Sequence, residues 1–582
     1  MSSATFVLLF RELADLLELK GDNPFKIRAY RRAADILETL DREDVAELAR
    51  EGQLKKINGI GVAIEDKVLE ILDTGTLKVL EDLRAEYPPG VMEMQKVPGI
   101  GPRTASLIFH ELGVKDIDEL EEAARSGKLR TLPGMGDKTE ENILRAIEKL
   151  KEEEDMTRIP LVDADLVAES LIGFIKSHVE ADEVSAAGSV RRRKETCGDV
   201  DIVVGTEDGS LISDLISSWN GFQSMISSEE DRVKSVAYNN VQVDISVVKP
   251  PEFPFALLAA TGSKPHWEGL RSVAGELGLT LSRKGLFNEK GEAFQARSER
   301  DIYEALGMEY VPPELREMTG EIEAARKKRL PGILVAEDIR GDLHIHTNWS
   351  DGADSIESMV EAARDLGYEY IAITDHSESL KIARGLSETR RKEQLKAINR
   401  VREKFEGIHV LFGVELEILK DGSLDHPDSV LSEFDIVIAS IHSAFGQQKD
   451  IMTARIVKAI QSGRVHVIAH PTGRVLGRRL GYDVDLDTVI HEAAKYNVAL
   501  EINAYPERLD LDSTWARKAA EAGAYIVINS DAHNTGELRH MSYGLDVARR
   551  AWLEPANVIN TWPLPKLLEW LNRRVFHPLP PL

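Results

Sequence analysis

Histidine and carboxylate residues gather in the C-terminal part of the chain, where twelve of the fifteen histidines lie after residue 340. Six of them, with three acidic residues, follow short apolar runs typical of buried strands. One such histidine alone could be an ordinary core residue, but together the nine predict a centre of about three Zn²⁺, Mn²⁺ or Fe²⁺ ions. Such ions polarise a phosphate ester and supply hydroxide at neutral pH. The candidate ligands are His344, His346, Asp351, His376, Glu415, His442, His470, Asp531 and His533.

A second set of carboxylates lies in the middle of the chain. Asp199 and Asp201 alternate with apolar residues, so both side chains project from one face of a strand. Asp244 lies in another alternating run. If the two strands pair, three carboxylates converge, and two divalent cations between them would support phosphoryl transfer. The alternative is a pair of solvated strand ends, but the turn Gly188–Arg192 just upstream favours the metal site.

Glycine turns of the form Gly-x-Gly recur in the first 150 residues, each before a helical pattern. They are Gly59–Gly61, Gly99–Gly101 and Gly134–Gly136. Such a turn presents backbone N–H groups at a helix N-terminus, where phosphate is attracted. The turns resemble the helix–hairpin–helix motif of DNA repair proteins, which binds the DNA backbone without reading sequence. We expect the first two turns to bind DNA and the third to be structural.

The elements that position these residues predict a multidomain α and α/β protein. Residues 1–150 read as short helices, 160–250 as a helix with strands, and 255–318 as helices again. From residue 339, apolar strand patterns alternate with helices, which predicts parallel strands in a closed barrel with its site at the carboxyl ends. Residues 324–332 combine basic residues with a Pro-Gly breaker, as a linker would.

Composition limits the function classes. The formal net charge of −26 argues against DNA binding through a basic surface, but backbone amides and metal ions can also bind phosphate. The single cysteine, Cys197, excludes an intrachain disulfide framework and indicates a reducing compartment. The apolar run Phe6 to Phe10 is too short for a signal peptide or membrane span. We therefore expect a cytoplasmic protein with no membrane partner.

The order of these motifs resembles that of prokaryotic (bacterial and archaeal) family X DNA polymerases with a C-terminal PHP (polymerase and histidinol phosphatase) domain. Gly188 to Asp201 looks like the palm motif of that family, and Thr261-Gly262-Ser263 looks like its turn before the thumb. All nine ligand positions of the PHP domain are filled. The resemblance implies a helical N-terminal region with helix–hairpin–helix motifs, a nucleotidyltransferase palm with a mixed sheet, a small thumb and a distorted (β/α)₇ barrel. The expected domains are a lyase-like domain at 1–88, a fingers-like region at 89–157, the palm at 158–252, the thumb at 253–318, a linker at 319–338 and the PHP domain at 339–582.

The resemblance also implies residue roles in the palm and thumb. Asp199 and Asp201 would bind two Mg²⁺ or Mn²⁺ ions, and Asp244 would bind metal and assist the attacking 3′-hydroxyl. The triphosphate would be held by Ser189, Arg192 and Gly198, and the template would be touched by Arg271.

Further implied contacts lie outside the palm. In the N-terminal region, Lys26, Tyr30 and Lys67 fall where the family's lyase subdomain binds a 5′-phosphate, positions it and forms a Schiff base. A catalytic lysine must be deprotonated by burial or nearby cations, and an ordinary solvated helix lysine is an equal alternative for Lys67. In the barrel, phosphate-binding or rim-salt-bridge roles are open for Lys381, Arg384, Arg474 and Arg478.

The chain departs from the family where the nucleotide is selected. The usual Tyr-Phe before the turn is Ala259-Ala260, a small polar residue is replaced by Trp267, and Ser282–Lys284 replaces Asn-Glu-Tyr. These changes predict slow, ribonucleotide-tolerant or absent polymerisation beside intact metal chemistry.

The predicted function is DNA repair by a gap-filling DNA polymerase joined to a metal-dependent 3′–5′ exonuclease, abasic-site endonuclease or 3′-end phosphoesterase. The expected partners are gapped, nicked or abasic-site duplex DNA with a 5′-phosphate, together with dNTPs, and we expect a monomer. Two alternatives remain: a DNA-targeted PHP nuclease whose polymerase is weak or lost, and a small-molecule phosphatase fused to a DNA-binding module. The glycine turns argue against the last.

Overall fold

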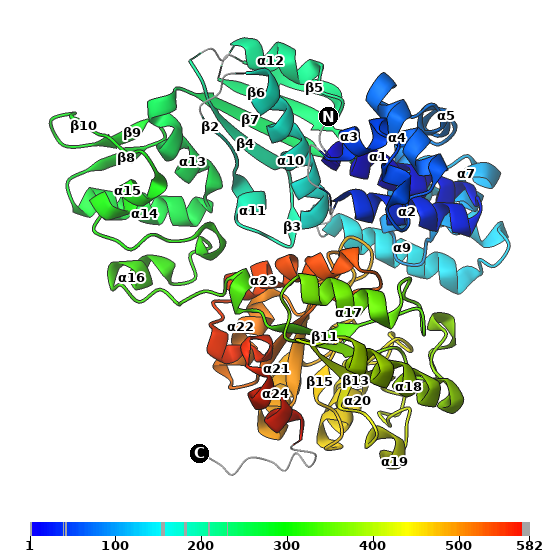
Figure 1. Ribbon diagram of the computed structural model, residues 1–582. Helices are drawn as coiled ribbons and strands as arrows, with labels where there is room; N and C mark the ends of the chain where they lie inside the picture. The colour runs from blue at the N-terminus through cyan, green and yellow to red at the C-terminus, as the bar shows by residue number, and fades with distance from the viewer. Residues whose placement is uncertain are drawn as a thin grey trace. The chain divides into compact units, whose positions relative to one another are not determined.

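Residues 3–38, 40, 44–152, 158–179, 183–207, 210–229 and 231–572 are described by the computed structural model of the chain (Figure 1). The chain divides into two compact units, Met1–Arg329 and Leu330–Leu582. Among the described residues, no helix has the length and apolar character needed to cross a membrane.

The N-terminal part of the first unit is helical, as predicted. Its first helix, α1, is buried over the run Phe6–Phe10, so this apolar segment forms the core of the region. Short 3-10 turns (η1 Leu54–Lys56, η2 Met94–Lys96 and η3 Leu129–Thr131) precede the three glycine turns. The helices are α1 (Ser3–Lys20), α2 (Pro24–Glu38), α3 (Asp44–Arg50), α4 (Val62–Thr74), α5 (Lys78–Glu86), α6 (Pro89–Glu93), α7 (Pro102–Leu112), α8 (Ile117–Arg125) and α9 (Asp137–Glu152).

A mixed five-stranded sheet follows, with strand order β2-β4-β7-β6-β5. Strands β4 and β7 are parallel and place Asp201 directly beside Asp244, while the other neighbours are antiparallel. The predicted pairing of the two carboxylate strands is therefore present. The elements are β1 (Ile159–Pro160), α10 (Leu161–His178), β2 (Glu183–Ala186), α11 (Gly188–Arg191), β3 (Thr196–Cys197), β4 (Val200–Gly205), α12 (Ser210–Ser217), β5 (Phe222–Ser228), β6 (Arg232–Ala237) and β7 (Gln242–Val248).

The last part of the first unit combines helices with a small antiparallel sheet of order β10-β9-β8. Its helix α16 lies inside the predicted linker 319–338. There Glu321 accepts a hydrogen bond from the fully buried His266, with Oε1 and Nδ1 2.6 Å apart, so α16 packs within the first unit. The division falls after Arg329. The elements are α13 (Phe253–Thr261), α14 (Lys264–Glu276), β8 (Thr280–Ser282), β9 (Gly285–Phe287), β10 (Ala293–Phe294), α15 (Glu299–Ala305) and α16 (Glu321–Arg326).

The second unit is a parallel seven-stranded barrel in sequence order, and helices surround the strands (Figure 1). A bridge between Ile345 and Ala532 brings the first and last strand regions together. Alternate strand residues enter two cores: one against the helices, the other inside and closed by Trp562 and Trp570. The strands are β11 (Gly341–Ile345), β12 (Tyr370–Ile373), β13 (His409–Glu417), β14 (Ile436–Ser440), β15 (Val467–Ile468), β16 (Ala499–Asn503) and β17 (Ile526–Asn529). The helices are α17 (Ile356–Asp365), α18 (Glu388–Lys404), α19 (Asp428–Leu431), α20 (Lys449–Gln461), α21 (Leu486–Tyr496), α22 (Ser513–Glu521), α23 (Met541–Arg550) and α24 (Leu564–Leu571).

Candidate active sites

The predicted metal ligands of the barrel come together at the carboxyl ends of its strands. Eight of the nine form three overlapping groups whose donor atoms lie within 4.8 Å of one another. The ninth, His470, is adjacent, with its Nε2 3.1 Å from Oε1 of Glu415. The groups are His346, Asp351, His376 and His533; His344, His346 and Asp531; and His376, Glu415 and His442.

Buried acceptors orient the ligand imidazoles. Nδ1 of His344 lies 2.8 Å from Oε1 of Glu501, and Nδ1 of His442 lies 3.0 Å from Oε2 of Glu417. In both rings Nε2 is left facing the centre, as in metal sites whose outer partners fix the tautomer. The sequence reasoning missed both glutamates, although Glu417 lies two residues after Glu415, on the same side of β13.

The charges of the centre fit a group of cations. Burial alone would lower the pKa of His376, but the carboxylates of Glu415 and Asp351 raise it to about 10. Burial would also lower the pKa of His533, but the carboxylates of Asp351 and Asp531 raise it to about 9. Protons on these rings neutralise the buried acids, and bound metal would replace them.

Two imidazole nitrogens in the centre are also unsatisfied. Nδ1 of His346 and Nδ1 of His470 are buried and accept or donate no hydrogen bond among the described residues. Buried polar atoms normally have a partner. This donor set of imidazoles and carboxylates therefore suits divalent transition metals.

Arginines beside the centre differ in what they contact. Arg474 donates from Nε to the carbonyl of Arg508 at 2.9 Å and also to that of Leu509, so it supports this loop. Arg508 brings its Nε to 3.8 Å from Oδ2 of Asp531. Arg478 lies on the rim, 3.4 Å from Glu507. The sequence pattern drew attention to Arg474, whereas Arg508 is the arginine that reaches a predicted metal ligand.

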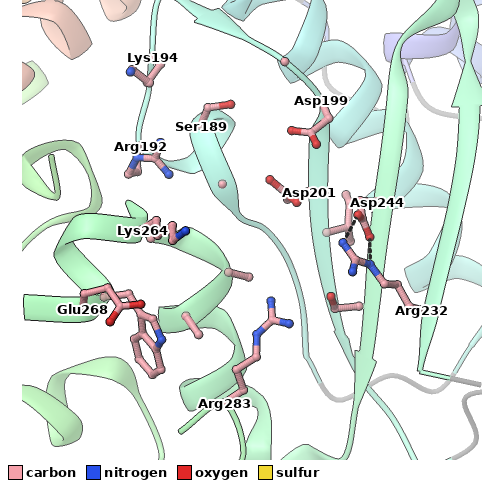
Figure 2. A pocket seen from close by; sticks show the side chains of 18 of the residues that line it. Ser189, Arg192, Lys194, Asp199, Asp201, Arg232, Asp244, Lys264, Glu268 and Arg283 are labelled. Atoms are coloured by element: carbon pink, nitrogen blue, oxygen red, sulfur yellow. Dashed lines mark hydrogen bonds and ion pairs between the residues drawn. The ribbon is translucent and has the colours of Figure 1, made fainter. Parts of the chain in front are cut away.

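The first unit holds a pocket of about 580 Å³ between the mixed sheet and the following helices (Figure 2). All six residues predicted for metal and triphosphate line it: Asp199, Asp201, Asp244, Ser189, Arg192 and Gly198. The departures Ala259, Ala260 and Trp267 also line the pocket, and Arg283 points into it (Figure 2).

The three carboxylates of this pocket have unequal surroundings. Burial and the charges of Asp199 and Asp244 raise the pKa of Asp201 to about 7. Burial and Asp244 also raise the pKa of Asp199. Burial would raise the pKa of Asp244 as well, but Arg232 and Lys234 bring it below its usual value; Nε of Arg232 lies 2.9 Å from Oδ1 of Asp244. The repulsion that remains between the other two acids would be relieved by divalent cations.

The turn before β4 needs a glycine at position 188. Its φ is +55°, and a Cβ there would lie 1.9 Å from Oδ2 of Asp201. The next residue, Ser189, is buried in the pocket wall. Arg192 is already engaged: its Nε lies 2.9 Å from Oε1 of Glu317, and Nη1 donates to the carbonyl of Thr261. A triphosphate bound through Arg192 would therefore compete with Glu317 for the guanidinium.

The glycine turns have the predicted geometry. Gly59 and Gly99 have φ of +99° and +96°, and Gly61 and Gly101 cap the N-termini of α4 and α7. No heavy atom would approach a Cβ built on Gly61, Gly99 or Gly101 within 4 Å. The backbone at Gly61, Gly99 and Gly101 is therefore open to an approaching phosphate, whereas side chains of Arg32 and Ile36 lie against Gly59.

The first and third turns share a support that the second lacks. In the first, the backbone N–H and Nζ of Lys55 donate to the buried Glu65. In the third, the backbone N–H and side chain of Arg130 donate to the buried Glu140. The equivalent residue in the second turn is Ala105. We expected the third turn to differ from the first two in being structural. The shared glutamate contact instead groups the third turn with the first.

The residues predicted for the lyase and template roles lie on three helices. Lys26 and Tyr30 are on α2, where Nζ of Lys26 lies 2.7 Å from Asp22 and the buried Tyr30 ring stacks on Phe10 with centroids 5.9 Å apart. On α4, Nζ of Lys67 lies 3.9 Å from Glu70, and on α14 the half-exposed Arg271 lies 3.6 Å from Glu268. The contact of Lys67 is acidic, not the cationic neighbour that activation by like charge requires.

Together the fold and the two sites define a class: a nucleotidyltransferase joined to a metal-dependent phosphoesterase. Family models match as DNA polymerase beta palm (158–233), DNA polymerase beta thumb (256–317), helix–hairpin–helix domain (1–77), SAM-like helix–hairpin–helix tandem (91–149) and PHP domain (342–504). The "DNA polymerase/3'-5' exonuclease PolX" of Bacillus subtilis (strain 168) is 39% identical over 576 residues, covering 98% of this chain and 100% of that protein. The chain belongs to the bacterial family X DNA polymerases with a C-terminal PHP domain.

Other similarities cover parts of the chain. A probable phosphatase of Thermoanaerobacter sp. (strain X514) is 31% identical over 246 residues, covering 40% of this chain and 94% of that protein. A ternary primer–template complex of Leishmania infantum polymerase beta is 22% identical, with a TM-score of 0.26, and covers 39% of this chain and 98% of that one.

Proposed function

We propose that this chain repairs DNA by template-directed gap filling at the palm and by 3′–5′ exonuclease, abasic-site endonuclease or 3′-end phosphoesterase action at the barrel. The observation that carries the proposal is the presence of two sites in one chain: a carboxylate site on the mixed sheet and a histidine- and carboxylate-rich site at the strand ends of the barrel. The whole-length similarity to a polymerase/exonuclease supports the same pairing of activities.

In the palm, Asp199 and Asp201 would hold two Mg²⁺ or Mn²⁺ ions, and Asp244 would complete the site beside the primer end. Bound there, such ions would activate the 3′-hydroxyl and neutralise the triphosphate. Ser189 and Gly198 line the wall where the phosphates would lie, and Arg192 would join them on leaving Glu317. Arg271 would contact the template strand.

In the barrel, the nine ligands would hold about three Zn²⁺, Mn²⁺ or Fe²⁺ ions, which supply a hydroxide and polarise the phosphodiester. Glu501 and Glu417 fix the ring orientation of His344 and His442. Asp351 and His533 are the most accessible ligands of the set, each with its side chain 32% accessible, and they mark the side from which substrate would enter.

The proposed substrates are gapped, nicked or abasic-site duplexes with a 5′-phosphate, together with dNTPs, acted on by a monomer. The turns at Gly59–Gly61 and Gly99–Gly101 would hold the DNA backbone through N–H groups. Lys26, Tyr30 and Lys67 would bind a 5′ end, and a 5′-deoxyribose-phosphate lyase reaction through Lys67 is a separate proposal.

One observation favours a second candidate, a PHP nuclease with weak or lost polymerase activity. The pocket wall carries Ala259, Ala260 and Trp267, and Arg192 is engaged by Glu317. A nucleotide would therefore meet the small side chains of Ala259 and Ala260 where the usual Tyr-Phe would pack against its sugar.

The deciding experiment supplies a gapped, 5′-phosphorylated duplex with dNTPs and Mn²⁺ to wild type, Asp201→Ala and His344→Ala. Extension lost only in Asp201→Ala supports the polymerase, and degradation lost only in His344→Ala supports the exonuclease. Degradation without extension in wild type favours the second candidate. If none of the proteins acts on DNA, both are wrong, and a small-molecule phosphatase joined to a DNA-binding module is left.

A further inference from the structure

A loop in the second unit leaves the metal centre at His376 and returns to it. The N–H of Leu386 donates to the carbonyl of His376 at 2.8 Å, and the N–H of Ser377 donates to that of Glu415 at 3.0 Å. Gly385 packs so closely that a Cβ there would lie 1.9 Å from the carbonyl oxygen of Ser377. The loop is therefore closed at its base beside two predicted metal ligands.

The far end of the loop is also fixed. Nη1 of Arg390 donates to the carbonyl of Arg384 at 2.8 Å, and Nη2 donates to the carbonyl of Trp349. Trp349 lies two residues before the predicted ligand Asp351. The N–H of Ser379 donates to Oδ2 of Asp425 at 3.0 Å. These bonds tie the loop to a second ligand segment and restrict its movement.

The tip of this anchored loop is apolar and fully presented to solvent. It is a short 3-10 turn, Lys381–Ala383, in which Ala383 is buried while Ile382 is 93% exposed. A single exposed aliphatic side chain is common on protein surfaces. Ile382 differs because its loop is held at several points and begins at a metal ligand.

Cations lie on both sides of Ile382. Lys381 is exposed, with Nζ 3.3 Å from Glu378. Arg384 is also exposed, and among the described residues its guanidinium makes no hydrogen bond or ion pair. In a chain of net charge −26, this pair of cations beside a metal centre is suited to phosphate groups.

We propose that Lys381, Ile382 and Arg384 form a rim loop that binds a DNA strand whose 3′-terminal phosphodiester lies in the metal centre. The two cations hold backbone phosphates, and Ile382 packs against a base without reading its identity. The inference rests on the proposed action of the barrel on DNA. It assigns the rim loop to strand binding and not to hydrolysis.

The test compares wild type, Ile382→Ser and the matched control Ile451→Ser, because Ile451 is an exposed isoleucine on α20. Three substrates are hydrolysed with Mn²⁺: single-stranded DNA, the same strand ending in 3′ abasic nucleotides, and bis(p-nitrophenyl) phosphate. We expect Ile382→Ser to lower kcat/KM on the normal strand roughly 10-fold, the scale of one lost aliphatic contact. The loss of kcat/KM caused by Ile382→Ser should be smaller on the abasic strand, and the variant should equal wild type on the nitrophenyl ester.

A second comparison tests the cations. The double variant Lys381→Ala/Arg384→Ala should reduce the slope of log affinity against log salt for single-stranded DNA by up to about 1.4. Its hydrolysis of the nitrophenyl ester should match wild type.

The outcomes that would overturn the rim-loop proposal differ from the outcome that would overturn the action of the barrel on DNA. Equal losses on all three substrates would show that Ile382 supports His376 structurally and would overturn the proposal. An active wild type with unchanged DNA kinetics in Ile382→Ser, or an unchanged salt slope in the double variant, would do the same while leaving the proposed function standing. A wild type that hydrolyses the ester but no DNA would remove the proposed action of the barrel on DNA, on which the inference rests.

Discussion

Nδ1 of His344 lies 2.8 Å from Oε1 of Glu501, and both side chains are fully buried inside the barrel. Glu501 also accepts a hydrogen bond from the backbone N–H of His470 at 2.7 Å. One carboxylate therefore orients two predicted metal ligands that come from different strands.

Glu501→Gln should weaken metal binding by about 10–100-fold, because the imidazole of His344 loses its charged acceptor. The measurement is the Mn²⁺ concentration that gives half-maximal exonuclease activity, with DNA synthesis by the palm as the internal reference. Glu521→Gln, an exposed glutamate on α22, is the control. An unchanged Mn²⁺ requirement would show that Glu501 is only a core residue.

Asp201→Asn should stabilise the metal-free protein at high pH. The pKa of Asp201 is raised to about 7, whereas an unfolded aspartate titrates near 4. Between these values the folded state keeps a proton that the unfolded state has lost, so wild type loses stability as pH rises through the window. Thermal unfolding in EDTA should show a larger advantage for Asp201→Asn at pH 8 than at pH 5. Added Mn²⁺ should stabilise wild type more than the variant, and equal responses would contradict the metal role.

Gly188→Ala should abolish DNA synthesis and leave exonuclease activity intact. The added methyl would meet Oδ2 of Asp201 in a backbone of φ +55°, which costs about 1–2 kcal/mol for the conformation alone. Gly307→Ala is the control, because φ there is +70° but no heavy atom lies within 4 Å of the added Cβ. Polymerase activity lost equally in both variants would point to general destabilisation.

His266→Phe should lower the free energy of unfolding of the first unit by about 1–3 kcal/mol. His266 bonds Glu321 through Nδ1 and Tyr303 through Nε2, at 2.6 and 2.7 Å, in a fully buried setting. It also lies on α14, whose neighbouring Trp267 lines the pocket, so KM for dNTP should rise while exonuclease kinetics stay constant. Tyr303→Phe removes only one of these hydrogen bonds and should show a smaller effect in denaturant unfolding.

The sequence allows prediction of those site residues that lie next to a recognisable strand pattern. His344 and His346 follow an apolar strand pattern, and Asp199 and Asp201 alternate with core residues, so period and strand ends were enough to place them. Glu501 and Arg232 could not be found this way, because each acts on a residue distant in sequence and each resembles an ordinary strand residue. Glu321 falls in the predicted linker 319–338, and its buried contact with His266, 55 residues earlier in the chain, has no local signal in the sequence.

The covalent continuity of the two units across Arg329 and Leu330 has a kinetic consequence. While the proposed contacts of the glycine turns hold the duplex, a DNA end that leaves one site would stay bound to the protein near the other, and short tethers give effective concentrations of about a millimolar. Rebinding would then compete with escape into solution. Trimming and resynthesis of a single DNA end could then proceed as consecutive events on one protein molecule. If the units were separated into two chains, each transfer of the end between sites would become a second-order encounter.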